Sequence, residues 1–226
     1  MGRICQACVH SIPVTGAAVS VMTAGGHRGL VYATDDTARS LEDVQFTVGD
    51  GPGCAAFESG RAVLVPDLAA SAAVPEQQGW PGFRDLSREL EVRAVFSFPL
   101  HLGRAVLGAL TTYRLAQGTP DGPSLARALR LSDAAAAAAL DLIVGADTEQ
   151  ANPAHTDSPS DEAQLYRAEI YQAAGMVTVQ FGVGIDVATL RVRAHAFATG
   201  EPISDIARQI VHHQLHLEAD DAATTE

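Results

Sequence analysis

The sequence predicts an α+β fold, in which an N-terminal antiparallel sheet with flanking helices is followed by three C-terminal helices. In the N-terminal part, runs of alternating apolar and polar residues are joined by glycine-containing turns, as in hairpins. Helical stretches interrupt these runs, which favours an antiparallel sheet over a doubly wound nucleotide-binding fold. Between 161 and 217 the apolar residues instead recur three and four positions apart, as they do on helices.

The N-terminal elements follow in order from turn residues and alternation. We expect a helix over 3–11, followed by strands over 17–22 and 30–33 that are joined at Gly25-Gly26. A short helix, capped by Asp35 or Asp36, should then end at Leu41. A tight loop over 49–53 and a helix over 55–59 follow. Further along, the pattern predicts a buried strand over 62–65, a helix over 83–90, strands over 93–102 and 105–113 joined at Gly103-Arg104, and a long alanine-rich helix over 123–144.

Each of the three C-terminal helices carries an apolar stripe, and three such stripes can close a small core. The first stripe consists of Ala163, Tyr166, Ile170, Ala173 and Val177, and Gly182 and Gly184 then end the helix. In the second helix, which ends at Gly200, we expect a core side formed by Val187, Leu190, Ala194 and Phe197. The third follows Pro202 with the stripe Ile203, Ile206, Ala207, Ile210 and Val211.

The pattern divides the chain into two folded parts. Residues 146–160 contain Asn152-Pro153, Ser158-Pro159 and scattered acids without an apolar period, which is typical of a flexible linker. Residues 219–226 are acidic and polar, and we expect a disordered tail. The expected domains are therefore 1–145 and 161–218.

Composition limits the classes of function. With 226 residues, of which 47% are apolar, the chain can bury a core. No stretch reaches the roughly 20 apolar residues of a membrane span, and no export signal is recognisable, so we expect a cytoplasmic protein without a membrane partner. No lysine occurs, which excludes a Walker-type phosphate loop and Schiff-base chemistry. The formal net charge of −12 opposes non-specific binding of nucleic acid.

The C-terminal part resembles a known family. The segments Ile170-Tyr-Gln-Ala-Ala-Gly-Met176, Leu190-Arg-Val-Arg-Ala194 and Ile203-Ser-Asp-Ile-Ala207 are similar to the ANTAR domain of bacterial RNA-binding antiterminators. The resemblance implies a paired three-helix unit that holds a terminator-competing RNA hairpin, with RNA and a second copy of the chain as partners. The candidate RNA-binding residues are Arg167, Gln172, Arg191, Arg193, Arg208 and His212.

An alternative interpretation is that these side chains are solvated or form ion pairs within the domain, and both interpretations stay open. The ANTAR pattern often has lysine where Ala174 stands, so one cation of a recognisable site is missing. His195, His212, His213 and His216 could add positive charge in mildly acidic solution.

The N-terminal part also resembles a known family. The motifs Gly49-Asp-Gly-Pro-Gly53, Gly60-Arg-Ala-Val-Leu-Val-Pro-Asp67, Trp80-Pro-Gly-Phe83, Phe98-Pro-Leu100 and Val106-Leu-Gly-Ala-Leu110 are similar to a GAF sensory domain, in the variety joined to ANTAR segments in actinobacterial regulators. The resemblance implies a sensor for an unidentified small-molecule or protein signal. Cyclic nucleotides are set aside, because the asparagine- and lysine-containing motif of the GAF domains that bind them is absent.

Several residues could carry chemistry, each with a structural alternative. Gly49 to Gly53 could cradle an anion, although a plain tight turn is favoured. His10, His27 and His101 could ligate haem or another metal, but none has paired spacing, so solvated histidines are favoured. Cys5 and Cys8 have the spacing of a zinc site or a redox dithiol, although no second pair exists and core packing is favoured. We therefore expect no cofactor.

Cys54 begins a helix after a glycine loop, where the helix dipole favours the thiolate, as a redox sensor requires. Some GAF-fold proteins are free methionine sulfoxide reductases that use cysteine thiolates, but relatives of this type tend to carry cysteine directly after Gly-Pro, where Gly53 stands here. The candidate ligand- or redox-sensing residues are Cys54, Asp67 and Phe98.

The sequence thus predicts a dimeric, signal-responsive regulator that prevents transcription termination and is not an enzyme, with the helix over 123–144 coupling the two domains. Two alternatives stay open. One is a GAF-based dimeric interaction module without RNA binding, and the other is a thiol enzyme related to methionine sulfoxide reductases.

Overall fold

The computed structural model describes residues 1–23, 26–70, 80–148 and 159–217. The chain divides into two units, residues 1–164 and 165–226. The expected linker over 146–160 lies mostly outside the described residues, and the expected tail over 219–226 lies wholly outside them.

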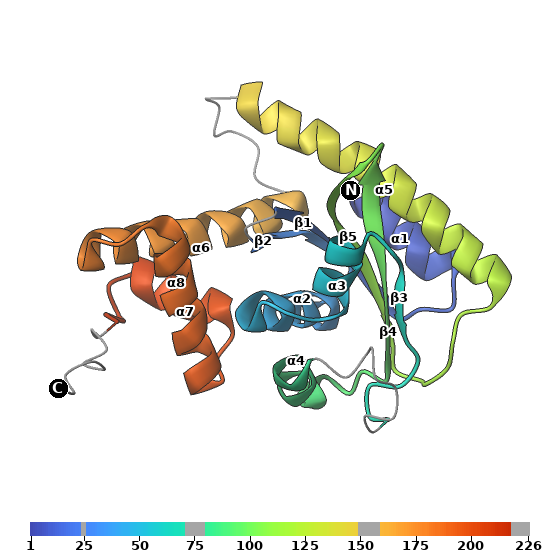
Figure 1. Ribbon diagram of the computed structural model, residues 1–226, viewed down its shortest axis with the longest axis horizontal. Coiled ribbons are helices and arrows are strands. Elements are labelled where there is room, and N and C mark those ends of the chain that lie inside the picture. Colours follow the sequence, from blue (N-terminus) through green and yellow to red (C-terminus); the bar gives the residue numbers. More distant parts are fainter. Residues whose placement is uncertain (24–25, 71–79, 149–158, 218–226) are drawn as a thin grey trace. The chain divides into compact units, whose positions relative to one another are not determined.

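The first unit is built on a five-stranded antiparallel sheet with strand order β2-β1-β5-β4-β3 (Figure 1). Its strands are β1 (Gly16–Thr23), β2 (Gly26–Ala33), β3 (Val63–Val65), β4 (Ala94–Leu102) and β5 (Ala105–Arg114). Both expected hairpins form, β1 with β2 and β4 with β5. The predicted antiparallel sheet with flanking helices is therefore confirmed.

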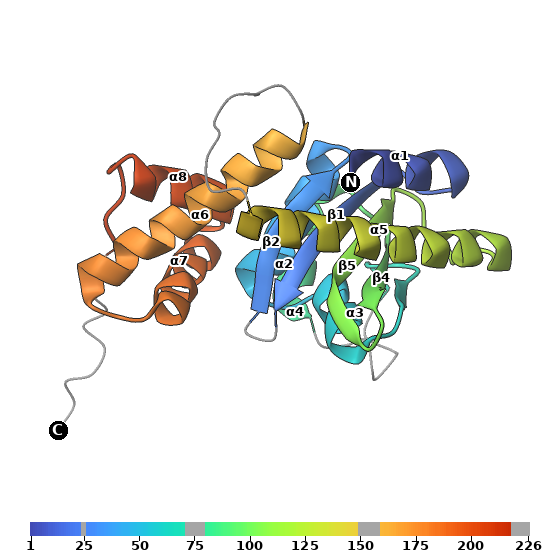
Figure 2. The ribbon, with the colours of Figure 1, turned by 90° about the horizontal axis from the view of Figure 1, so that it is seen from above.

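Helices cover both faces of this sheet. On one face lie α1 (Gly2–Ser11) and the long α5 (Gly122–Thr148), and Figure 2 shows α5 crossing the strands. On the other face lie α2 (Asp36–Val48) and α3 (Pro52–Ser59), with α4 (Pro81–Leu86) packed against α2 and a short 3₁₀ turn, η2 (Arg88–Leu90), after it. The first unit therefore has three layers (Figure 1).

Strand alternation separates two environments. Val19 and Val21 of β1 join the apolar core beneath α1 and α5, whereas Ser20 between them faces α2. On β4, Phe96 and Phe98 likewise point into the apolar core, whereas Ser97 is bonded to Thr111 of β5. The face under α2 and α3 consequently receives the polar side chains of the strands.

Two helices are longer than expected. Asp35 caps α2 as predicted, since its Oδ1 accepts the Ala38 N–H at 2.8 Å. The expected end at Leu41 is wrong, because α2 continues to Val48 and ends at Gly49, whose φ is +75°. Buried Glu42 and Gln45 hide the apolar period on this stretch. Similarly, α3 begins at Pro52 rather than at 55, with the proline in the first turn.

The strand expected over 62–65 is shorter and less buried than predicted. β3 covers only three residues and pairs with β4 alone, so it is an edge strand. Of its residues only Val65 is buried, because the outer side of an edge strand has no neighbour.

The second unit contains α7 (Ile185–Thr199), α8 (Ile203–Val211) and, from Leu165 onward, α6 (Pro159–Phe181), so the three predicted helices form. In the expected stripes of α6 and α8, the buried residues are Ile170, Ala173, Val177, Ile203, Ile206, Ala207 and Ile210, whereas Val211 at the end of α8 is only half-buried. The side chains of Ala163 and Tyr166 lie outside the description.

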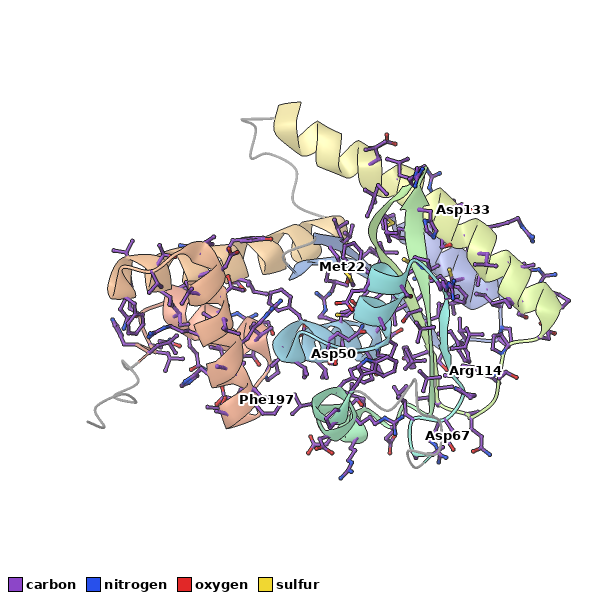
Figure 3. The ribbon with its side chains drawn as sticks, in the orientation of Figure 1. Met22, Asp50, Asp67, Arg114, Asp133 and Phe197 are labelled. Atoms are coloured by element: carbon purple, nitrogen blue, oxygen red, sulfur yellow. The ribbon has the colours of Figure 1, made fainter. Side chains whose placement is uncertain are left out.

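The expected core face of α7 is wrong. Its buried residues are Ala188, Val192 and Ala196, whereas the predicted core residues Leu190 and Phe197 are 62% and 52% exposed. Figure 3 labels Phe197 on this helix. Small and β-branched side chains let α7 approach its neighbours closely, and the larger apolar residues remain on the outside.

In the described part of the chain, no single helix is long and apolar enough to cross a membrane. One pair, Glu169–Phe181 with Ile185–Thr199, passes the same criterion together, on length and composition only, with a bend of 107°.

Candidate functional site

A chain of buried hydrogen bonds links the sheet to α2 and α3 in the first unit. The Ser20 hydroxyl donates to Glu42 Oε2 at 2.5 Å, and Gln45 Nε2 donates to Glu42 Oε1 at 2.8 Å. The Gly53 N–H in turn donates to Gln45 Oε1 at 2.6 Å. Ser20, Glu42 and Gln45 are at most 2% exposed. Buried polar groups that are satisfied in this way fix one arrangement of the elements they join.

A side chain at position 53 would crowd this network. A Cβ at Gly53 would lie 2.9 Å from Gln45 Oε1 and 3.2 Å from Thr111 Oγ1, which is closer than side chains normally approach. A cysteine at this position, directly after Gly51-Pro52, would therefore disturb the Gln45 contact. Sequence reasoning missed Glu42 and Gln45, because polar residues within a helix are usually solvated.

The glycine loop before α3 uses its own N–H groups. Gly51 N–H donates to Asp50 Oδ1 at 2.8 Å, and Gly53 N–H is bonded to Gln45. These bonds favour the predicted tight turn over an anion cradle. Burial raises the pKa of the Asp50 carboxyl, although hydrogen bonds from Gly51 and Trp80 oppose the shift. Figure 3 shows Asp50 and Asp67 in different parts of this unit.

The three candidate sensing residues do not meet at one site. Cys54 lies in the first turn of α3 and is 7% exposed. Asp67 follows β3 and accepts the Arg93 guanidinium at 3.1–3.3 Å. Phe98 belongs to the apolar core beneath α1 and α5, whereas α3 covers the other face of the sheet. The structure therefore does not bring Phe98 or Asp67 together with Cys54.

The remaining cysteines are core residues. Cys5 and Cys8 are fully buried on α1, and burial raises the pKa of each thiol to about 12. Such thiols remain protonated, which favours packing over metal or redox chemistry. His10 and His101 are exposed and bond to backbone carbonyls, while the side chain of His27 is not described. Within the described ranges, no group of three metal-ligating side chains forms.

The predicted RNA-binding residues are dispersed over the second unit. Arg208 is paired with Asp205 at 3.1 Å and Glu169 at 3.8 Å, as expected if the arginines form ion pairs within the domain. Gln172 on α6 and His212 at the end of α8 are exposed, and Arg193 on α7 is half-buried. The side chain of Arg167 lies outside the description.

Arg191 has a different environment. Its guanidinium lies over the Phe181 ring, 4.3 Å from the ring centroid, and it makes no ion pair with any described residue. It also lines a pocket of about 530 Å³ between α7 and the segment that follows α8, together with Ala194, His195, Ala198, Leu215, His216 and Leu217. Sequence reasoning missed this pocket, because its two walls are separated along the chain and the fold-back after α8 has no local signal.

Comparison with known proteins shows that the first unit matches a known domain family. The family model described as GAF domain matches residues 3–142. Similar solved structures include the GAF domain from a phosphoenolpyruvate-protein phosphotransferase of Coxiella burnetii, with 15% identity, a TM-score of 0.47 and coverage of 64% of this chain and 83% of that one. A type II free methionine-R-sulfoxide reductase from Thermoplasma acidophilum has 14% identity, a TM-score of 0.45 and coverage of 61% and 87%. A GAF domain/HD domain protein from Geobacter sulfurreducens has 12% identity, a TM-score of 0.45 and coverage of 63% and 90%. No curated protein matches the chain.

Proposed function

The chain belongs to the GAF domain family, and on this premise we propose that it is a signal-responsive transcription regulator whose second unit binds RNA hairpins and prevents termination. In this proposal the GAF unit receives a small-molecule or protein signal and performs no catalysis. The three-helix unit acts on nascent RNA, as its resemblance to the ANTAR domain implies.

Arg191 is the observation that carries the RNA proposal. The guanidinium of Arg191 lies over the Phe181 ring, and a guanidinium held on a ring can still donate its N–H groups to a ligand. Arginine in this arrangement suits bidentate contact with phosphate and stacking with an unpaired base. The absence of a carboxylate partner among described residues supports a role in binding, since the chain as a whole carries a net charge of −12.

The buried network of the GAF unit supports signal reception. Ser20, Glu42, Gln45 and Gly53 connect β1, α2 and α3 through hydrogen bonds that have one satisfied arrangement. A signal that displaced α3 would break the Gly53 contact and change the packing of the layer over the sheet. The long helix α5 on the opposite face is the proposed coupler to the second unit, because it contacts β4 and β5.

The exposed face of α7 supports the dimeric form of the proposal. Val187, Leu190, Ala194 and Phe197 are all exposed and follow one another at intervals of three, four and three residues. This is the spacing of the apolar seam between two paired helices. The proposed occupant is α7 of a second copy, because a seam of this spacing is complementary to itself in a symmetric pair.

A gel-shift assay tests the RNA proposal. The full chain is titrated into tandem-hairpin RNAs at low and moderate salt, with Arg191→Gln compared with Arg208→Gln. We expect binding that weakens as salt rises, because contact with phosphates releases counterions, and a selective loss in Arg191→Gln. No complex with any such RNA at low salt would refute the RNA proposal.

The exposed seam of α7 favours a second candidate, a dimeric interaction module without RNA binding. The pairing of Arg208 with Glu169 and Asp205 agrees with it, since this cation is already neutralised within the unit. A dimer that shows no RNA binding at low salt would establish this candidate in place of the first.

A further inference from the structure

The pocket between α7 and the segment after α8 brings Arg191 together with two histidines that the proposed function does not use. Three nitrogen-bearing side chains line it, those of Arg191, His195 and His216, and none of the other lining residues within the described range 159–217 is a carboxylate. We propose that this pocket binds a phosphate group, either that of a free nucleotide or that of an RNA backbone.

The guanidinium of Arg191 is positioned before any ligand arrives. Its stacking on Phe181, a residue of α6, holds it at the wall of the pocket and restricts its rotamers. Two parallel N–H donors of a guanidinium match two phosphate oxygens, and such charge-assisted bonds are roughly twice as strong as neutral ones. Because the donor is already ordered, binding costs less side-chain entropy.

The imidazoles add donors from two different elements. His195 lies on α7, one turn beyond Arg191, and His216 lies on the returning segment. The His216 ring stacks on the ring of His213, with centroids 6.2 Å apart. An anion between α7 and this segment would therefore be approached from both walls, which a single exposed arginine cannot achieve.

The returning segment is held by hydrogen bonds, so the pocket is a built feature. The N–H groups of Gln214 and Leu215 both donate to the Gln209 carbonyl, at 2.8 and 3.1 Å. Further on, Gln180 Nε2 of α6 donates to the Leu217 carbonyl at 2.6 Å. These bonds fix both ends of the segment 214–217 against the helices.

Size and apolar lining indicate more than a bare anion. About 530 Å³ lies within the range of roughly 300–1,000 Å³ found for small-molecule sites. The small side chains of Ala194 and Ala198 on α7 leave room in the pocket. Leu215 and Leu217 provide apolar surface on its other wall. This combination suits a base or ribose next to the phosphate, so a nucleotide should bind more tightly than inorganic phosphate.

The test follows the His195 and His216 imidazole signals of the full chain by NMR at fixed pH and ionic strength. Inorganic phosphate, adenosine monophosphate and adenosine are added in separate titrations. We expect saturable shifts of both signals with phosphate and with the nucleotide, the nucleotide binding more tightly than either phosphate or adenosine. Failure of both imidazoles to shift with either phosphate-bearing probe would overturn the proposal.

Variants separate the pocket from general charge. Arg191→Gln should weaken nucleotide binding by about 10-fold or more, as expected for loss of a charge-assisted pair, whereas Arg208→Gln should leave it within about 2-fold. Ala198→Leu, which fills the pocket without changing charge, should weaken binding as well and serves if Arg191→Gln folds poorly. Equal weakening by the two arginine variants would also overturn the proposal.

A competition arm assigns the source of the phosphate. If tandem-hairpin RNA displaces the nucleotide, the pocket holds the RNA backbone, and this arm alone rests on the proposed function. If RNA does not compete, the pocket serves a free nucleotide. Nucleotide binding without any RNA binding would refute the proposed function and leave the pocket assignment standing.

Discussion

The Gly53 N–H donates to the side-chain oxygen of Gln45 at 2.6 Å, which ties the first turn of α3 to the last turn of α2. Gln45 also donates to Glu42, which in turn accepts from Ser20 on β1. Three elements of the GAF unit are thus joined through side chains withdrawn from water. Loss of one partner leaves another buried polar group unsatisfied, so substitutions in this network should lower the stability of the layer formed by α2 and α3.

Gly53→Ala should destabilise the GAF unit. The added Cβ would meet Gln45 and Thr111, and overpacking of a buried site costs about 1–3 kcal/mol. Gly122→Ala is the matched control, because no atom lies within 4 Å of the Cβ position there. Thermal unfolding of the two variants measures the difference, and equal stability would contradict the tight packing of Gly53.

Glu42→Gln should also be destabilising. The glutamate accepts hydrogen bonds on both oxygens, from Ser20 and from Gln45, whereas a glutamine presents an NH₂ group to one of these donors. The expected loss in free energy of unfolding is about 1–3 kcal/mol. Glu58→Gln, at an exposed position on α3, should change little. Denaturant titration of both variants checks this, and a neutral Glu42→Gln would contradict the network.

Stability at alkaline pH should depend on Tyr113. Its hydroxyl donates to Asp35 Oδ1 at 2.9 Å, and burial together with this hydrogen bond raises the pKa of Tyr113 to about 12. The folded state therefore holds the phenolic proton more tightly than the unfolded state, where the pKa is about 10. The contribution to stability is complete below about pH 10 and is lost as the pH rises towards about 12.

Denaturant titrations between these pH values measure the effect. Tyr113→Phe removes the titrating group, so its free energy of unfolding should fall less steeply with pH than that of the original protein. Identical slopes for the two proteins would show that Tyr113 does not carry this dependence.

Cysteine modification should be selective. Cys5 and Cys8 are fully buried, and the pKa of each is raised to about 12, so alkylating reagents should reach them only when α1 is displaced. Cys54 retains slight exposure and should react first. Mass spectrometry after timed alkylation checks the order.

In parallel, we expect no turnover of free methionine sulfoxide, and turnover abolished by Cys54→Ser would instead make the protein a thiol enzyme.

Leu190→Glu should dissociate the proposed dimer. A carboxylate in the middle of the α7 seam would be buried without a partner in a pair of such helices. Val179→Glu on α6 is the control, since that side chain is 84% exposed and lies off the seam. Sedimentation of the full chain should show a monomer only for Leu190→Glu. A monomeric original protein would contradict the pairing.

The sequence predicted the helices of the second unit well where the apolar spacing is itself a consequence of burial. The stripes of Ile170 to Val177 and Ile203 to Ile210 were recognisable because apolar spacing on a helix reflects burial directly. The same rule failed for α7, where small Ala188 and Ala196 fill the core and larger Leu190 and Phe197 remain exposed. Spacing identifies a helix face but cannot say which of two apolar faces is covered.

The site was harder to predict than the fold. Cys54 was identified from its glycine loop, but Glu42 and Gln45 carry no local sign that they are buried. The pocket at Arg191 depends on His216, a residue brought back by hydrogen bonds to Gln209 and Gln180. Such contacts depend on tertiary structure, and hydrophobic periodicity contains no information on them.

RNA recovered by crosslinking in the protein's own cells is the most direct test of the central claim, that the three-helix unit holds folded transcripts. We predict enrichment of tandem hairpins upstream of terminators, retained in Arg208→Gln and lost in Arg191→Gln at equal protein abundance. An RNA population that is the same for the original protein and for a chain lacking residues 165–226 would contradict it.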